Sequence, residues 1–271
     1  MQKIGNMLRV DKVSVSLTNK KILHQIDLTA LPGKVTVIIG PNGSGKSTLI
    51  RAISGEIPYH GKISLNGHDI RTIKPHDLAS KRAVLPQKSI LAFPFTVAEV
   101  VHIGLRNGEG AETTRTIQDA LCCVGLSTFA RRQYSELSGG EQQRVQLARV
   151  LAQVWTPCND GQARWIFLDE PISNLDIAHQ IDVMNIVKKY ARSGGGVVVI
   201  MHDLNLTSMY ADKVALLHRG KSVCAGAPKD VITDGWLSDV YACDLRVNKS
   251  PKPPATYILP HMANTRQNRV K

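Results

Sequence analysis

The 271-residue chain has no apolar run that approaches the ~20 residues needed to span a membrane. Its first residues, MQKIGNMLRV, also lack the apolar segment of a secretory signal. Both absences predict a soluble protein of the cell interior and argue against an integral membrane protein and against a secreted one.

Cysteines are few and follow no motif. They are Cys122, Cys123, Cys158, Cys224 and Cys243, and no two of them form a CxxC pair. Their number is odd, which fits reduced thiols in a cytosol better than a disulfide framework or a zinc site. We therefore assign them no chemistry.

The chain also lacks solenoid repeats and low-complexity tracts, while 43% of its residues are apolar. This composition and length favour one core with a subdomain. The net charge of +12 favours an anionic partner, either nucleic acid or an anionic membrane surface, and charge alone leaves both open. Part of that charge lies in the C-terminal tail NTRQNRVK, which we expect to be a solvated chain end.

Hydrophobic patterning predicts an α/β order interrupted by a helical block. Residues 95–135 have helical spacing, and residues 178–191 form an amphipathic segment. Strands are predicted at 8–17, 21–34, 34–39, 61–67, 81–87, 164–169 and 195–202. Strands that alternate with helices favour a parallel sheet, which here carries a helical subdomain.

The stretch GPNGSGKST fits the phosphate-loop pattern G-x-x-x-x-G-K-[ST]. It joins a predicted strand to a predicted helix, so the free N–H groups of the helix start would meet an anion. We expect Lys46 to reach the β- and γ-phosphates and the Ser47 hydroxyl to bind Mg²⁺, with Gly43 and Gly45 allowing close approach. The candidate nucleotide-binding residues are Gly40, Pro41, Asn42, Gly43, Ser44, Gly45, Lys46, Ser47 and Thr48.

Polar residues follow three other predicted strands. Asp169 and Glu170 end the buried run WIFLDE, and a P-loop enzyme needs a carboxylate there for Mg²⁺. Asp169 suits the metal, and Glu170 is placed to accept a proton from the attacking water as general base. His202 ends another strand, where it would contact the γ-phosphate, and the Gln87 amide would reach a Mg²⁺-bound water.

A second glycine pair occurs far downstream, in SELSGGEQQRVQ. Ser138 and Glu141 form a capping box at the start of a predicted helix, and this alone would make the segment a well-capped helix. Gly139 and Gly140 weaken the first turn, however, and capping does not require them. They are explained if a phosphate approaches the backbone, so the chain has a second phosphate-binding candidate.

In these motifs the sequence resembles the ATP-binding subunits of ABC transporters over residues 8–235. The P-loop, Gln87, the signature LSGGEQQR, the strand WIFLDE, the segment SNLD and His202 stand in the family order. The resemblance implies a P-loop NTPase with a RecA-like parallel-sheet core, an N-terminal antiparallel β-subdomain and an α-helical signature subdomain. It implies one domain over 1–271: a catalytic core at about 1–94 and 160–240, the helical subdomain at 95–159 and a C-terminal extension at 241–271.

The resemblance also implies how the second glycine pair is used. Two copies would face each other head to tail, with each ATP between the P-loop of one copy and the signature of the other. Ser138, Gly139, Gly140 and Glu141 would then contact the partner's ATP, and Asp176 of SNLD would couple the two sites. The implied ligands are ATP and Mg²⁺, the metal being held by Ser47, Gln87 and Asp169.

Three further segments are similar to the ATPases of importers of iron complexes, haem and vitamin B12: FPFTVAEVV, PISNLDIAHQ and HDLNL. The long connection at 154–165 is similar to that of hemin-importer ATPases. This implies two transmembrane permease subunits, indirectly a periplasmic haem-binding protein, and a peripheral position on the cytoplasmic face of the bacterial inner membrane. Ferric siderophore or vitamin B12 import, or an exporter cassette, are the alternatives.

The resemblance has two departures and one further rival. Leu17 stands near the position where many relatives stack an aromatic ring on adenine, and Asn174 stands where a small residue is commoner. A DNA-repair or chromosome-maintenance ATPase shares the signature, but no heptads of the required coiled coil occur between Thr48 and Ser138. We therefore expect no nucleic-acid partner.

Overall fold

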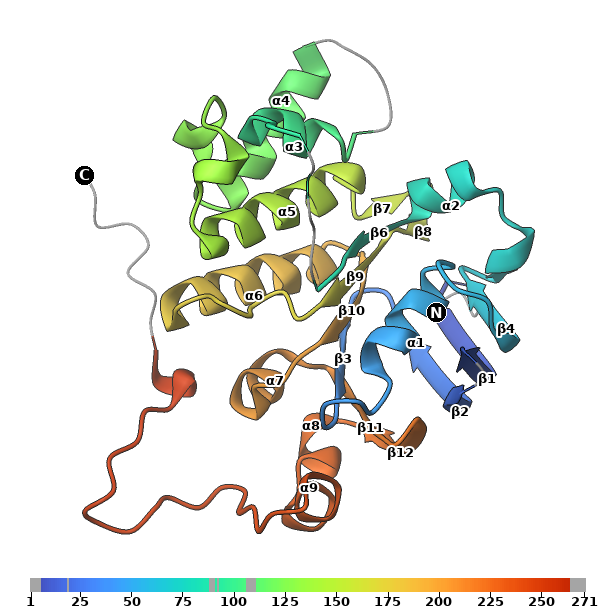
Figure 1. Cartoon of the computed structure of the whole chain (residues 1–271), viewed down its shortest axis with the longest axis vertical. Coiled ribbons are helices and arrows are strands. Elements are labelled where there is room, and N and C mark those ends of the chain that lie inside the picture. The colour runs from blue at the N-terminus through green and yellow to red at the C-terminus, as the bar shows by residue number, and fades with distance from the viewer. Residues whose placement is uncertain (1–5, 19, 88–90, 92, 106–110, 264–271) are drawn as a thin grey trace.

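The computed structural model describes residues 6–18, 20–87, 91, 93–105 and 111–263. Its centre is a six-stranded sheet in which the neighbours β11, β3, β10, β9 and β6 run parallel and β12 pairs antiparallel at one edge (Figure 1). In sheet order the strands are β12 (Lys221–Gly226), β11 (Lys213–His218), β3 (Val35–Ile39), β10 (Gly196–Ile200), β9 (Trp165–Asp169) and β6 (Arg82–Leu85). The predicted parallel sheet is confirmed.

Both faces of this sheet are buried, because alternate side chains of each central strand enter different cores. In β9, Ile166 and Leu168 join the cluster under α5 (Gly139–Gln153) and α6 (Ile177–Arg192), whereas Trp165 and Phe167 join the cluster around α1 (Lys46–Ile53). All four side chains are 0% exposed. The uninterrupted apolar run in the sequence reflects this two-sided burial.

A second sheet, entirely antiparallel, packs against the α1 side. Its order is β2 (Lys20–Ala30), β1 (Leu8–Leu17), β4 (His60–Leu65) and β5 (His68–Asp69). β4 turns into β5 through Asn66 and Gly67, which both have positive φ. This is the backbone that an Asn-Gly hairpin turn requires.

Asn66 also joins the two sheets. Its buried side chain accepts a hydrogen bond from the indole Nε1 of Trp165 (3.0 Å) and donates one to the carbonyl of Ala163 (2.8 Å). We expect Asn66→Ala to lower the free energy of unfolding by about 2 to 4 kcal/mol, because it leaves a buried donor and a buried acceptor unpaired. Chemical denaturation of the full chain measures this.

Lys62→Ala, an exposed position on β4, the strand that leads into this turn, is the matched control and should change the free energy of unfolding by less than about 0.5 kcal/mol. Equal stability of the two variants would contradict the role given to Asn66.

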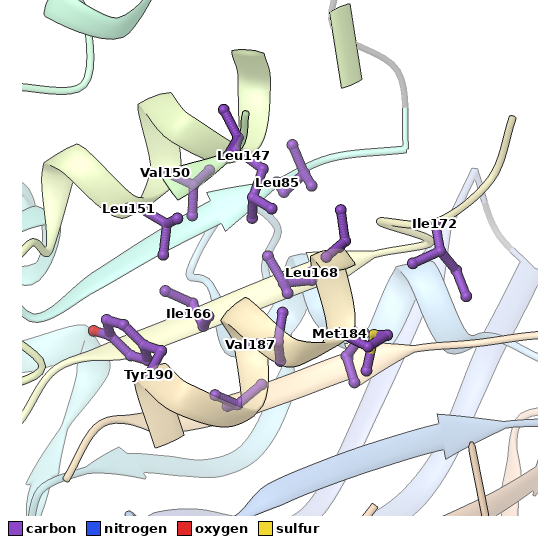
Figure 2. Close-up of a cluster of buried hydrophobic side chains, with 14 of the residues drawn as sticks. Leu85, Leu147, Val150, Leu151, Ile166, Leu168, Ile172, Met184, Val187 and Tyr190 are labelled. Atoms are coloured by element: carbon purple, nitrogen blue, oxygen red, sulfur yellow. The ribbon is translucent and has the colours of Figure 1, made fainter. Parts of the chain in front are cut away.

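The helical block contains α3 (Val97–His102), α4 (Ala111–Cys123) and the first turns of α5, with short 3-10 segments η2 (Ser127–Phe129) and η3 (Tyr134–Glu136). The helices predicted between residues 95 and 135 are confirmed for the described residues there. Figure 2 shows how α5 is held: Leu147, Val150 and Leu151 face the apolar side chains Leu85 and Ile166 of the sheet. Val145, Ala148 and Ala152 of the same helix are buried as well.

The long connection at 154–165 folds as a small hairpin, β7 (Cys158–Asn159) with β8 (Gln162–Ala163). Asp160 and Gly161 form its turn with positive φ. Asn6 fastens it, since its side chain bonds Gly161 O and Ala163 N, each at 3.1 Å. The sequence analysis anticipated only a longer connection here, because strands this short carry no hydrophobic periodicity.

The remaining elements border the core. They are η1 (Ile70–Thr72), α2 (Pro75–Lys81), α7 (Leu204–Tyr210), α8 (Pro228–Val231), α9 (Asp234–Tyr241) and η4 (Pro260–Met262). After α9 the chain returns to α7, where His261 Nε2 lies 3.0 Å from the Ser208 hydroxyl. The tail NTRQNRVK lies outside the described residues. Within the described ranges, no helix combines the length and apolarity needed to cross a bilayer.

Candidate nucleotide site

The phosphate loop connects β3 to α1, and its glycines adopt conformations that other residues rarely reach. Gly40, Gly43 and Gly45 have φ of 146°, 76° and 100°. A Cβ on Gly40 would overlap the carbonyl of Leu217 in β11, whereas one on Gly43 would meet none of the described residues within 4 Å. Gly40 is thus required by packing, and Gly43 leaves its backbone open to the pocket.

Lys46 lies in the first turn of α1 and is only 5% exposed. Its ammonium donates to the carbonyls of Gly40 (2.8 Å) and Pro41 (2.9 Å), so it closes the loop from inside. Burial lowers the pKa of Lys46, and the charges of Glu170 and Asp169 oppose that shift. The positive charge is therefore held among groups of opposite sign, at the base of the loop.

Asp169 ends β9 beside the start of α1. Burial raises the pKa of this carboxyl group, while a hydrogen bond with Ser47 acts to lower it. Its Oδ1 is buried and has no hydrogen-bond partner among the described residues. A buried carboxylate oxygen without a donor, beside a hydroxyl, is the oxygen ligand set that Mg²⁺ prefers, so the residues present fit that ion.

Glu170 follows directly, with a left-handed φ of 55°. Its carboxylate lies 2.6 Å from His202 Nε2 and accepts a hydrogen bond from the Gln87 amide at 3.1 Å. Burial acts to raise the pKa of Glu170, but the contacts with His202 and Gln87 outweigh it and the pKa is lowered. The carboxylate is therefore ionised at neutral pH, the state in which it can accept a proton.

Three predicted residues are thus brought together from the ends of β6, β9 and β10. Gln87 and Glu170 line a pocket of about 440 Å³ together with Lys46 and Ser47, and His202 is joined to it through its contact with Glu170. Lys20 and Ile22 also line this pocket, and neither was predicted from the sequence. Leu17, which was expected near the adenine ring of the nucleotide, is half-buried and lies opposite Lys20 in the pairing of β1 with β2.

The second glycine pair lies in another pocket, of about 400 Å³, which shares no lining residue with the first. Ser138 caps α5, and the capping box with Glu141 is confirmed: Ser138 N and Oγ each lie 2.8 Å from the Glu141 carboxylate. In the part of the chain that the structure describes, a Cβ on Gly139 would meet nothing within 4 Å, whereas one on Gly140 would press on Leu175 and Asn174. Only Gly140 has a packing reason to be glycine.

The opposite wall of this second pocket is the segment SNLD. Asn174 has a left-handed φ of 64°, a conformation that Asn tolerates better than most residues. Asp176 caps α6: its carboxylate accepts from His179 N (2.9 Å) and lies 2.8 Å from His179 Nδ1. Arg144 and His179 complete the lining, and the sequence analysis singled out neither. The available signal was their spacing of three positions from Glu141 and Asp176, which places each of them beside a predicted site residue on one helix face.

Comparisons with known proteins agree with this geometry. A family model described as ABC transporter matches residues 23–173. The hemin import ATP-binding protein HmuV of Jannaschia sp. (strain CCS1) is 58% identical over 95% of each chain. HmuV of Mesorhizobium japonicum is 51% identical over 94% of this chain and 98% of that protein.

Two solved structures are similar in fold. An ATP-binding cassette of an ABC transporter in its ADP conformation is 25% identical, with a TM-score of 0.75 over 88% of this chain and 98% of that one. A bacterial Atm1-family ABC exporter with ATP bound is 23% identical, with a TM-score of 0.76 over 89% of this chain and 42% of that one. An exporter cassette thus shares this fold, and the fold alone does not fix the direction of transport.

Proposed function

Because this chain belongs to the ABC transporter family as an ATP-binding protein, we propose that it powers hemin import through a partner permease. The observation that carries this proposal is the identity of 58% over 95% of the chain to a hemin import ATP-binding protein. The 23% identity to an exporter cassette gives the exporter alternative much less support. Ferric siderophore or vitamin B12 import would use the same machinery and stays the second candidate.

The hydrolytic step is proposed to depend on three parts of the pocket. The P-loop backbone and Lys46 bind the phosphates of ATP. Glu170, kept ionised by its neighbours, accepts the proton of the attacking water, and His202 orients that carboxylate and contacts the γ-phosphate. Ser47, Asp169 and Gln87 would hold Mg²⁺, which when bound supplies positive charge against the phosphates.

We further propose that two copies assemble head to tail around two ATP molecules. Support comes from the separation of the pockets: Ser138, Gly139, Gly140, Glu141 and Asp176 line a pocket distinct from that of the P-loop in the same chain. A phosphate bound at this second pocket would therefore belong to an ATP molecule held by the P-loop of a second copy.

Ser138→Arg tests this assembly. The single subunit should bind ATP with an affinity within about twofold of wild type, whereas the ATP-dependent dimer should be lost. The reason is that the long arginine side chain would fill the second pocket, where the partner's nucleotide docks, and would leave the P-loop pocket unchanged. Analytical ultracentrifugation with ATP, in a Glu170→Gln background, measures the dimer. Ser127→Arg, an exposed serine of the same subdomain, is the control. Loss of ATP binding by the isolated subunit would instead place Ser138 at its own nucleotide.

The remaining partners follow from the hemin-import proposal. We propose that the dimer binds two permease subunits on the cytoplasmic face of the bacterial inner membrane, with a periplasmic haem-binding protein acting upstream and no nucleic acid involved. We also propose that the chain is one domain, with residues 95–159 as the helical subdomain and 241–271 as an extension.

Growth separates the two cargo candidates. Deletion of the coding sequence should abolish growth on hemin as sole iron source and leave growth on a ferric siderophore intact. Wild type should restore growth on hemin, and Glu170→Gln should not. Loss of growth on the siderophore alone would keep the ATPase assignment and reject hemin as cargo.

A further inference from the structure

The backbone carbonyl of Glu170 receives three hydrogen bonds. Two are local, from Ser173 N (3.3 Å) and Ser173 Oγ (3.0 Å). The third comes from Gln143 in α5, whose Nε2 donates at 3.3 Å from 27 positions away along the chain. A side chain of the signature helix therefore touches the main chain of the candidate general base.

The Glu170 main chain is a place where such a contact has consequences. Its φ of 55° lies in the left-handed region, where a glutamate stays only if its surroundings hold it. The carbonyl and the side chain of Glu170 branch from the same Cα, and that side chain contacts Gln87 and His202. A donor that fixes this carbonyl therefore fixes where the proton acceptor points.

The same helix carries the second pocket at its start. Ser138 caps α5, and Gln143 lies two positions beyond Glu141, about half a helical turn. Farther along, Leu147 and Leu151 pack over β6 and β9, as Figure 2 shows, so α5 rests on the strand that ends at Asp169. One helix thus connects the pocket of the glycine pair to the carbonyl of Glu170.

We propose that Gln143 is a positioning residue that makes the proton acceptor of each subunit responsive to its own signature helix. This inference rests on the proposed ATP hydrolysis. When the signature docks on the partner's nucleotide, the position of α5 determines whether the Gln143 amide meets the Glu170 carbonyl. Each subunit then couples two ATP molecules. One is the partner's ATP, which its signature contacts, and the other is the ATP that its own P-loop binds and that it hydrolyses.

The test compares Gln143→Ala and the near-isosteric Gln143→Glu with Gln153→Ala in the full chain. Gln153 is the matched control, because it also ties α5 to the core, by donating to Ala79 O (2.9 Å) and Arg82 O (3.1 Å), but it does not touch Glu170. Both Gln143 variants should lower kcat for ATP about tenfold with KM within about twofold, since ground-state binding is retained. Gln153→Ala should leave both constants within about twofold.

A second measurement keeps folding effects apart. In a Glu170→Gln background, Gln143→Ala should cause no further loss of residual hydrolysis, because the two residues act as one unit. A further loss there, unchanged kcat in both Gln143 variants, or equal losses of kcat and melting temperature in Gln143→Ala and Gln153→Ala would overturn the inference. Absence of ATP hydrolysis by the wild-type chain would instead overturn the proposed function.

Discussion

Glu170→Gln is expected to reduce ATP hydrolysis by a factor of about 10² or more, in line with the loss of a general base. The amide keeps the size of the side chain and can still contact Gln87 and His202, so the pocket should retain its shape. It cannot accept a proton from water. ATP binding should therefore persist, and the closed dimer should accumulate, since hydrolysis is what opens it.

Steady-state phosphate release and equilibrium binding of ATP measure the two halves of this prediction. Glu56→Gln is a suitable control, because Glu56 is exposed, lies 3.8 Å from Arg51 and accepts a 3.0 Å hydrogen bond from the Ser54 hydroxyl that glutamine can also accept. Near-normal turnover of Glu170→Gln would remove Glu170 from the general-base role and direct attention to His202.

Lys46→Ala is expected to weaken ATP binding about 10- to 100-fold, the effect of losing charged hydrogen bonds worth about 1.5 to 3 kcal/mol. Lys20 and Lys46 both line the pocket, but Lys20 does not belong to the P-loop. The Lys46 ammonium donates hydrogen bonds to two carbonyls of that loop. Removing it leaves Glu170 and Asp169 without the nearby positive charge that opposes theirs. Repulsion of the phosphates therefore adds to the lost contacts.

Direct titration of the full chain with ATP measures this affinity. Lys34→Ala is the control, because Lys34 lies just before β3, with its side chain 54% exposed and 3.5 Å from Asp212. Unchanged affinity of Lys46→Ala would contradict the assignment of the P-loop, whereas equal losses in both variants would indicate a general effect of net charge.

The parts of the site that were predictable from the sequence are those formed by residues adjacent to one another along the chain. The P-loop, the capping box at Ser138 and the carboxylates after β9 are each contained in a few consecutive positions, so local geometry follows from the letters. Gln87, Glu170 and His202 follow the ends of β6, β9 and β10, and parallel strands bring such ends to one edge.

Contacts that depend on strand order or on helix docking were not predictable in this way. In the six-stranded sheet, β3 lies between β10 and β11, and no local sequence pattern specifies that strand order. The contact of Gln143 with Glu170 arises only because α5 rests on β6 and β9 at one particular rotation. The Asn66 bond to Trp165 similarly joins two sheets whose residues are far apart in the chain.

The shared burial of the two sheets has a consequence for how this protein melts. Trp165 and Phe167 of the parallel sheet lie in one apolar cluster with Leu8 and Ile26 of the antiparallel sheet. Neither sheet can separate without exposing the side chains of the other, so the two should lose structure in a single cooperative transition. Trp165, buried and bonded across that boundary, would act as its fluorescent reporter, whereas the half-exposed Trp236 on α9 would report the periphery.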